Sequence, residues 1–313
     1  MRIGFHTNQL CERGTSVAMF DYAYHCREMF GAECFIFYDA TSPFNVQESV
    51  HRFMRFFGCY GYREFDEVEK ISLMIRLDLM YFIKSGEDDG KLVRCCRSVV
   101  HAVFCDEPHG DIYAVISEQI RRSSAIVPHM VSLPKEGITP MRRSLGIPAN
   151  AIVLGRHGGY DTFDDPVVKI GIMHILEEDP GMWIVFVNTE PFHHHERIIY
   201  LDKIVEPIEK SAFILSCDAM IYGRTQDETF GLAIAEFSCL GRPIIINRVY
   251  DGYHKKILGP ENAIYFNGTP DDLIHTLRNI RQLISYKPDW TNYLQFNPQD
   301  VMSTFHDVFI QGP

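Results

Sequence analysis

The chain alternates from end to end between short, continuous apolar runs and longer segments of helical character. Continuous apolar runs are typical of strands in a parallel sheet, since helices bury both faces of such a sheet. The runs in the first half are RIGF, ECFIFY, LDLMYFI, SVVHAVF, AVIS and AIVP, and those in the second half are AIVLG, MWIVFV, IIYL, DAMIYG, PIIIN and AIYF. Helices are expected near 14–29, 167–178, 207–215, 231–240 and 270–284. The pattern predicts an α/β fold with two parallel sheets.

The alternation of apolar runs and helical segments stops between His129 and Pro148, a stretch that contains Pro134 and Pro140. We expect an interdomain linker here, with a short basic helix around 141–145. The expected organisation is therefore two doubly wound, Rossmann-like domains facing across a cleft. They cover residues 1–135 and 136–290. A C-terminal helix over 291–313 could cross back to the first domain.

The charge balance, the cysteines and the lengths of the apolar runs limit the expected binding partners and the expected cellular compartment. Lys and Arg total 30 against 41 Asp and Glu, and the formal net charge of −11 disfavours binding to nucleic acid. The nine cysteines include no Cys-x-x-Cys pair, which indicates reduced thiols in a cytoplasmic compartment. No stretch approaches the roughly 20 apolar residues of a membrane span.

One segment of the first half has two interpretations. Between 45 and 57, apolar residues gather on one helical face: Val46, Val50, Phe53, Met54 and Phe57. Packing of this face against the first sheet is the simpler interpretation. The alternative is a peripheral contact with the cytosolic face of a membrane, or with a lipid acceptor.

The segment DAMIYGRTQDETFGLAIAEFSCLGRPIII carries the strongest chemical signal. A strand leads into a polar loop, and a helix opens near Gly231. A helix N-terminus presents free N–H groups and the positive end of a dipole, which suits a diphosphate. Glu228 lies in the loop and Glu236 within the helix, where their carboxylates can accept hydrogen bonds from sugar and ribose hydroxyls. The alternative is an ordinary amphipathic helix with two surface glutamates.

This segment resembles the Glu-x7-Glu signature of retaining GT-B glycosyltransferases, especially glycosyltransferase family 4. The matching positions are Glu228, Phe230, Gly231, Leu232, Glu236, Gly241 and Pro243. The resemblance implies that Glu236 holds the ribose, that Glu228 contacts the donor sugar, and that the N–H groups of Gly231 and Leu232 face the phosphates.

The strand that follows the linker ends in Gly155-Arg156, and the resemblance makes Arg156 a ligand of the diphosphate. A solvated loop arginine is the alternative. The family usually has a Lys six residues later, where this chain has Thr162. Arg224, Lys169 and His157 could each supply the missing charge. We favour Arg224, because it shares the loop of Glu228.

In the first half, the resemblance is looser. Gly14 and Thr15 match the family's first strand-to-helix loop near the donor, although a generic glycine turn explains them almost as well. His101 matches a family histidine near the reacting sugar, and its rival interpretation is a buried core histidine. His109, in EPHGD, is a second loop candidate.

No metal or other cofactor is expected. The chain lacks an Asp-x-Asp triplet, and the consecutive His193, His194 and His195 diverge too much to chelate an ion well. The paired aspartates at 88–89, 164–165 and 271–272 are interpreted as loop or helix-start residues.

The resemblance implies a retaining transferase that moves a sugar from a nucleotide-diphosphate donor to a hydroxyl of a glycan, lipid or small molecule. His101, Arg156, Arg224 and Glu228 would form its catalytic set. Two alternatives stay open: a nucleotide-sugar epimerase on the same fold, and a non-catalytic nucleotide-sugar-binding module.

Overall fold

A computed structural model describes residues 1–312 and divides the chain into two compact units. Unit 1 consists of Met1–Ser132 together with the chain from Gln295 onward, and unit 2 is Leu133–Leu294. The units therefore meet three residues before the expected boundary at 135, and four residues after the expected boundary at 290. Each unit contains one sheet, and every strand pairing that was identified in either sheet is parallel.

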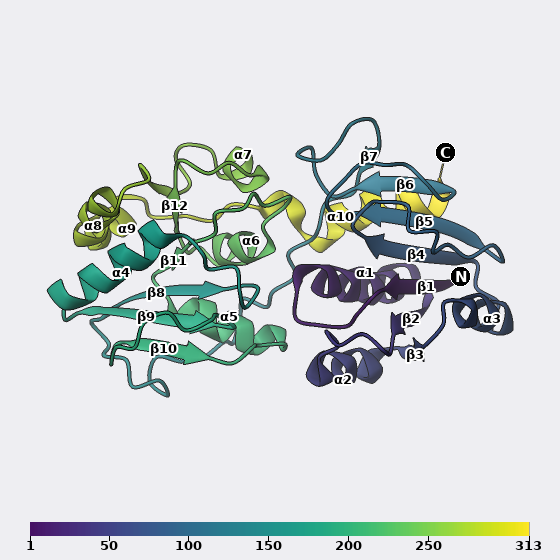
Figure 1. Ribbon diagram of the computed structural model, residues 1–313, viewed down its shortest axis with the longest axis horizontal. Coiled ribbons are helices and arrows are strands. Elements are labelled where there is room, and N and C mark those ends of the chain that lie inside the picture. The colour runs from purple at the N-terminus through teal and green to yellow at the C-terminus, as the bar shows by residue number, and fades with distance from the viewer. Residues whose placement is uncertain (313) are drawn as a thin grey trace. The chain divides into compact units, whose positions relative to one another are not determined.

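Unit 1 has a sheet of order β3-β2-β1-β4-β5-β6-β7 (Figure 1). Its strands are β1 (Arg2–Thr7), β2 (Glu33–Asp39), β3 (Gly58–Tyr62), β4 (Leu79–Lys84), β5 (Arg97–Ala102), β6 (Ile112–Val115) and β7 (Ala125–Ile126). Its helices are α1 (Gly14–Phe30), α2 (Gln47–Phe56), α3 (Asp66–Ile75) and α10 (Pro298–Phe305), followed by a π-helical turn over His306–Gln311. A short 3-10 turn over Leu294–Phe296 precedes α10.

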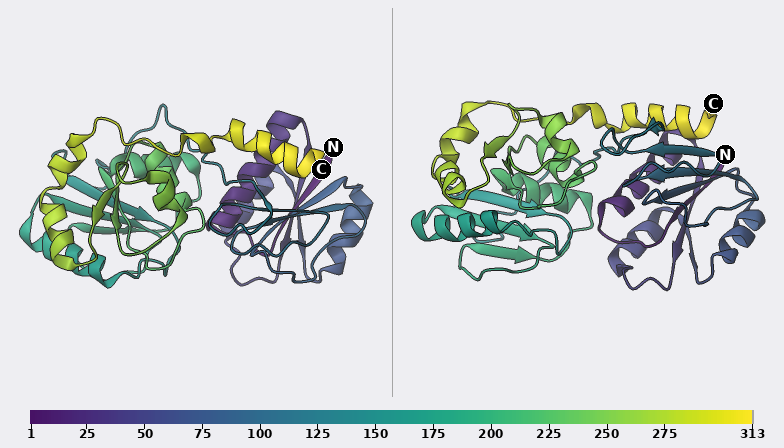
Figure 2. Two further views of the ribbon diagram at one scale, coloured as in Figure 1. Left: turned by 90° about the horizontal axis from the view of Figure 1, so that it is seen from above. Right: turned by 45° about the horizontal axis from the view of Figure 1, so that its top comes forward.

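Aromatic side chains connect α1, β4 and α10 on one face of this sheet. The ring of Tyr22 from α1 stacks on Phe305 from α10, with 5.1 Å between ring centroids, and lies 5.8 Å from Tyr81 of β4. Figure 2 shows the C-terminal helix beside α1 in both views. The C-terminal segment is thus part of the core of unit 1.

Aromatic rings at α2 pack against Phe20 of α1. The rings of Phe53 and Phe57 lie 5.1 and 5.5 Å from that of Phe20, whereas Met54 points outward and is exposed. Among the described residues, no helix combines the length and the apolar character that crossing a bilayer requires.

Unit 2 has a sheet of order β10-β9-β8-β11-β12-β13. Its strands are β8 (Ile152–His157), β9 (Met182–Val187), β10 (Ile198–Leu201), β11 (Ala219–Ile221), β12 (Ile244–Asn247) and β13 (Ile264–Phe266). Its helices are α4 (Pro166–Glu178), α5 (Pro207–Ser216), α6 (Leu232–Cys239), α7 (Tyr253–Leu258), α8 (Pro270–Arg278) and α9 (Ile280–Tyr286).

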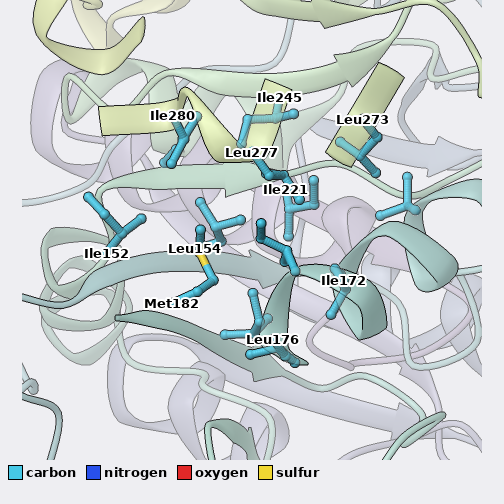
Figure 3. Packing of buried hydrophobic residues seen from close by; sticks show 14 of the residues in the cluster. Ile152, Leu154, Ile172, Leu176, Met182, Ile221, Ile245, Leu273, Leu277 and Ile280 are labelled. Carbon is cyan, nitrogen blue, oxygen red and sulfur yellow. The ribbon is translucent and has the colours of Figure 1, made fainter. Parts of the chain in front are cut away.

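The two faces of this sheet are covered by different helices. On one face, Leu154 of β8 packs in a cluster with residues of α4, α8 and α9, including Ile172, Leu273 and Ile280 (Figure 3). Neighbouring residues of a strand point to opposite faces. Gly155 accordingly lies against α5 and α6, where an added Cβ would meet Phe237 at 3.2 Å.

Three helices begin with a capping side chain followed by a proline. Asp165, Thr269 and Asn297 each accept a hydrogen bond from a backbone N–H of the first turn, and each is followed by proline. A proline at this point sacrifices no hydrogen bond, because that N–H has no helical partner. The helix-start interpretation of Asp165 is confirmed, and Asp271 and Asp272 lie in the first turn of α8.

Two sequence predictions of helices were wrong. Residues 141–145 form turns instead of a basic helix, and Gly146 follows with a φ of 70°. Arg142, in this segment, forms an ion pair with Asp218 of unit 2, with 2.7 Å between Nη2 and Oδ2. The helix expected over 270–284 is interrupted at Asn279, which separates α8 from α9.

Candidate functional site

The order of strands in unit 2 reverses between β8 and β11, which are neighbours in the sheet. In open parallel sheets, ligands bind at the carboxyl ends of the strands at such a reversal, because the loops there diverge to opposite faces. Arg156 and His157 end β8, and Arg224 and Glu228 lie in the loop after β11. The sequence-predicted residues of the second half thus gather at one edge of one sheet.

Arg156 is a buried cation held by neutral groups. Its side chain is 5 % exposed, and Nη1 donates to the carbonyl of Asn188 at 3.2 Å and to Oγ1 of Thr189 at 2.6 Å. Nη2 donates to the carbonyl of Gly159 at 2.9 Å and to Oγ1 of Thr162 at 2.5 Å. Burial lowers the pKa of Arg156 to about 10, so the guanidinium still carries its charge at neutral pH. These bonds fix the orientation of the guanidinium without neutralising it.

Arg224 and Glu228 form an ion pair in the loop between β11 and α6. Nη1 of Arg224 lies 3.1 Å from Oε1 of Glu228, and Nη2 donates to Gln226 at 3.4 Å. The hydroxyl of Tyr222 donates to the same glutamate oxygen at 3.5 Å. Burial raises the pKa of Glu228, although Arg224 and Tyr222 oppose that effect. The charges of Arg224 and Glu228 also act on Arg156, so the three groups share one electrostatic environment.

The N-terminus of α6 follows this loop directly. Gly231 is the N-cap residue, with a left-handed φ of 82°, and no side chain caps the helix. Glycine adopts this conformation without steric cost. Leu232 is the first helical residue and is partly exposed, whereas Phe230 is buried against Tyr293. The N–H groups of Gly231 and Leu232 therefore belong to an uncapped helix start, while the Phe230 side chain has a core position.

Glu236 lies within α6 and is paired on both sides. It is 4 % exposed, with Oε1 at 2.8 Å from Nζ of Lys210 and Oε2 at 2.9 Å from Nε2 of His157. Burial alone would raise the pKa of Glu236, but Lys210 and His157 lower it to about 2. The carboxylate is therefore ionised at any physiological pH.

His101 is not brought to this edge. It is fully buried in β5, Nδ1 lies 2.6 Å from the Tyr81 hydroxyl, and Nε2 lies 2.7 Å from the carbonyl of Val127. Burial lowers its pKa to about 3. Both ring nitrogens have protein partners, which is the geometry of a core histidine and gives no access to a substrate.

The remaining candidates of the first half lie at the start of α1. Gly14 is the first residue of this helix and is exposed, and Thr15 follows it. Both therefore lie in the first turn of the helix that follows the loop after β1. In the loop near β6, Nδ1 of His109 lies 2.7 Å from the Glu107 carbonyl.

Sequence reasoning missed three residues of this edge: Lys210, Tyr222 and His254. Lys210 belongs to α5, and its spacing from Glu236 along the chain gives no sign of the ion pair. His254 of α7 is buried 5.2 Å from the ring of Tyr222, and its Nδ1 has no hydrogen-bond partner among the described residues. Burial lowers the pKa of His254 to about 4, so it is neutral.

Within residues 1–312, His, Cys, Asp and Glu side chains nowhere gather in groups of three suited to a metal ion. The three consecutive histidines, 193–195, lie in an irregular segment before β10. Asp89, one of the paired aspartates, forms an ion pair with Lys84, with 2.5 Å between Oδ1 and Nζ.

No protein-family model and no curated protein sequence matches this chain. Solved structures do resemble it along its whole length. HepE of Anabaena, in complex with UDP-glucose, has a TM-score of 0.72 at 13 % identity, covering 98 % of this chain and 100 % of its own. A glycosyltransferase from Rickettsia africae has a TM-score of 0.66 at 11 % identity, covering 98 % and 94 %.

A UDP-N-acetylglucosamine 2-epimerase is also similar, with a TM-score of 0.64 at 8 % identity and coverage of 99 % of this chain and 96 % of its own. At these identities, the similarity concerns the fold. The chain has the GT-B fold, built from two Rossmann-like units.

Proposed function

We propose that this protein is a retaining glycosyltransferase that moves a sugar from a nucleotide-diphosphate donor to a hydroxyl of an acceptor. The observation that carries the proposal is the grouping of Arg156, Arg224 and Glu228 beside the uncapped start of α6, at the strand reversal of unit 2. The acceptor is a glycan, a lipid or a small molecule.

The diphosphate would lie at the start of α6, where the N–H groups of Gly231 and Leu232 point outward from the helix. Arg156 supplies a fixed positive charge that its own hydrogen bonds do not cancel. Arg224 is the second cation, in place of the lysine that Thr162 replaces. Of its two rivals, Lys169 lies over the ring of Phe192 at 5.5 Å. Burial lowers the pKa of His157, so its ring carries no charge at neutral pH.

In the proposed reaction, the acceptor oxygen forms a bond to the anomeric carbon as the bond from that carbon to the diphosphate oxygen breaks. The proton of the acceptor hydroxyl passes to the departing diphosphate. Negative charge grows on the leaving group, and preorganised cations and N–H groups lower the free energy of that state more than that of the bound donor. Glu228 would accept hydrogen bonds from the donor sugar, and Glu236 from the ribose.

The test is a panel of UDP-, GDP-, ADP- and dTDP-sugars, measured first by thermal shift and then by release of free nucleotide with candidate acceptors. A ligand at one hundred times its dissociation constant should add about 2.7 kcal/mol of stability to the protein. The proposal predicts stabilisation by one donor class and release of its nucleotide when an acceptor is present. Absence of stabilisation by every member of the panel would refute it.

A nucleotide-sugar epimerase is the second candidate, favoured by the similarity in fold to the UDP-N-acetylglucosamine 2-epimerase. Incubation with a UDP-sugar and no acceptor distinguishes the two, because only an epimerase would produce a new epimer. A pure binding module would bind the donor and release no nucleotide with any acceptor.

A further inference from the structure

Three elements of unit 2 converge on the carboxylate of Glu236. It is held by Lys210 from α5 and by His157 from the end of β8, while Glu236 itself belongs to α6. All three side chains are largely withdrawn from water, with 12 % of the Lys210 and His157 side chains exposed and 6 % of that of Glu236. An ion pair this well shielded keeps its geometry, since water competes little for its partners.

The walls around this group are apolar and fix the position of His157. Its ring stacks on Phe237 with 5.7 Å between centroids and 18° between planes, and it meets the edge of Phe213 at 6.2 Å. Of the two partners, Lys210 lowers the pKa of Glu236 more through its charge than His157 does, so its ammonium is the main compensating charge.

The pairing leaves hydrogen-bonding capacity on the carboxylate. An ionised carboxylate has about four lone-pair positions on two oxygens. Lys210 donates to Oε1 at 2.8 Å, whereas Nε2 of His157 lies 2.9 Å from Oε2 without the geometry of a hydrogen bond. At least one acceptor position on each oxygen remains, and two adjacent oxygens that each accept one bond fit a pair of neighbouring hydroxyls.

We propose that Lys210 is a positioning residue that holds Glu236 ready to bind the 2′,3′-diol of a ribose, and that this arrangement makes the site selective for ribonucleotides over deoxyribonucleotides. The inference rests on the proposed function, since it places the nucleotide of the donor on α6. Lys210 itself would not touch the nucleotide. Its effect passes through the orientation and the charge of Glu236.

The experiment compares two ligands on matched variants. The first ligand is whichever of UDP, ADP and GDP stabilises the wild-type protein most, and the second is the 2′,3′-dideoxy form of the same nucleotide. Lys210→Met removes the ammonium and keeps most of the side-chain length, whereas Lys210→Arg keeps a cation. Lys203→Met, at an exposed position of the same unit, is the control. Dissociation constants are measured by calorimetry.

Wild type and Lys203→Met should bind the ribonucleotide about tenfold or more tightly than the dideoxy form, the effect of hydrogen bonds to a charged group. Lys210→Met should lose most of this discrimination while its affinity for the dideoxy form stays within about twofold of wild type. Lys210→Arg should restore part of the discrimination. If Lys210 had a purely structural role, Lys210→Met would weaken the binding of both ligands equally.

Unchanged discrimination in Lys210→Met would overturn the inference and leave the proposed function standing. Absence of binding by UDP, ADP, GDP and dTDP to the wild type would overturn both, whereas binding of dTDP alone would overturn only the inference. If Lys210→Met does not fold, Lys210→Gln replaces it, because its amide retains an N–H donor without the charge. The same loss of discrimination is then expected, and its retention would count against the inference.

Discussion

Thr162 accepts a hydrogen bond from Arg156, with 2.5 Å between Oγ1 and Nη2, and its hydroxyl donates in turn to the carbonyl of Gly159 at 2.9 Å. Position 162 is where the resembled family usually has a lysine. In this chain the position supplies an acceptor to the buried arginine instead of a second cation. The loop after β8 is therefore built around Arg156, and a lysine at 162 would lose that acceptor and add a like charge beside it.

The first prediction follows from this bond. Thr162→Val should lower the free energy of unfolding by about 1–3 kcal/mol, the usual cost of leaving a buried charged donor without its partner. Thr162→Lys should cost at least as much and should not restore a cation to the proposed phosphate site. Urea denaturation measures both. Thr304→Val is the control, since its exposed hydroxyl only donates to a carbonyl of its own helix. Equal stability of Thr162→Val and wild type would contradict the assigned bond.

The second prediction places the nucleotide on unit 2. Hydrogen–deuterium exchange with the stabilising nucleotide-sugar should slow in the loop after β8, over 157–165, and in the loop into α6, over 223–232, because bound phosphates would engage those N–H groups. Peptides before Pro128 serve as the internal reference and should change little. Protection concentrated in unit 1 would refute the placement of the base and ribose.

The sequence was sufficient for the main architecture because the buried strands are continuous apolar runs. It was insufficient for one edge strand. β3, with the sequence GCYGY, forms the edge of the unit 1 sheet, and its glycines and exposed positions gave no strand signal. With so few apolar residues, β3 could not be told from a loop by its pattern, whereas the more apolar edge strands β7, β10 and β13 could be predicted.

The sequence also predicted only part of the candidate site. Arg224 and Glu228 could be predicted together because they share one loop and pair across a single turn. The pairing of Glu236 with Lys210 and His157 could not, because the fold brings it together from separate elements. His101 was suggested by the resemblance from its place late in a first-half strand, and the structure surrounds its ring with the core of unit 1.

The third prediction concerns acid stability. The pKa of Glu236 is about 2 in the folded protein and ordinarily 4.5. The stability that comes from its ionisation is therefore fully present above about pH 5 and is lost as the pH falls toward 2. Between pH 7 and pH 3, wild type should lose about 2 kcal/mol through this group.

Glu236→Gln should not show that part of the loss, so the stability difference between it and wild type should shrink as the pH falls. The control is Glu209→Gln, at an exposed position of α5. Denaturation at several pH values measures the effect. A stability difference that is independent of pH would mean that Glu236 is not held in its ionised form by its partners.

The fourth prediction is that transfer proceeds without a divalent metal. In the proposed site, Arg156, Arg224 and the start of α6 would supply the positive charge that a metal could otherwise provide. Activity should therefore remain within about twofold of its initial value in excess EDTA, a change of less than 0.5 kcal/mol in barrier. Loss of activity in EDTA that added Mg²⁺ or Mn²⁺ reverses would show that the protein cations are insufficient.

The last prediction concerns Arg224, whose guanidinium lies 3.1 Å from Glu228. If Arg224 acts mainly on the leaving diphosphate, Arg224→Ala should lower kcat and kcat/KM together, by roughly 2–4 kcal/mol of barrier. Arg143→Ala, at an exposed position of the same unit, should leave both constants unchanged. Turnover of Arg224→Ala near that of wild type would assign the second cation to Lys169 or His157.

The ion pair between Arg224 and Glu228 leads to a further expectation. It distinguishes the effect of the Arg224 charge on the leaving group from its effect on the ionisation of Glu228. Removing Arg224 leaves Glu228 without its cation, and burial then raises the pKa of that carboxyl further. In the proposed site, Glu228 would accept its strongest hydrogen bonds from the donor sugar while it is ionised, so Arg224→Ala should also lose donor affinity at acidic pH, where wild type does not. Steady-state kinetics at pH 5.5 and pH 8 measures this: KM for the donor should rise at the lower pH in Arg224→Ala alone. A KM that does not depend on pH in the variant would mean that Arg224 contributes charge to the leaving group without maintaining Glu228.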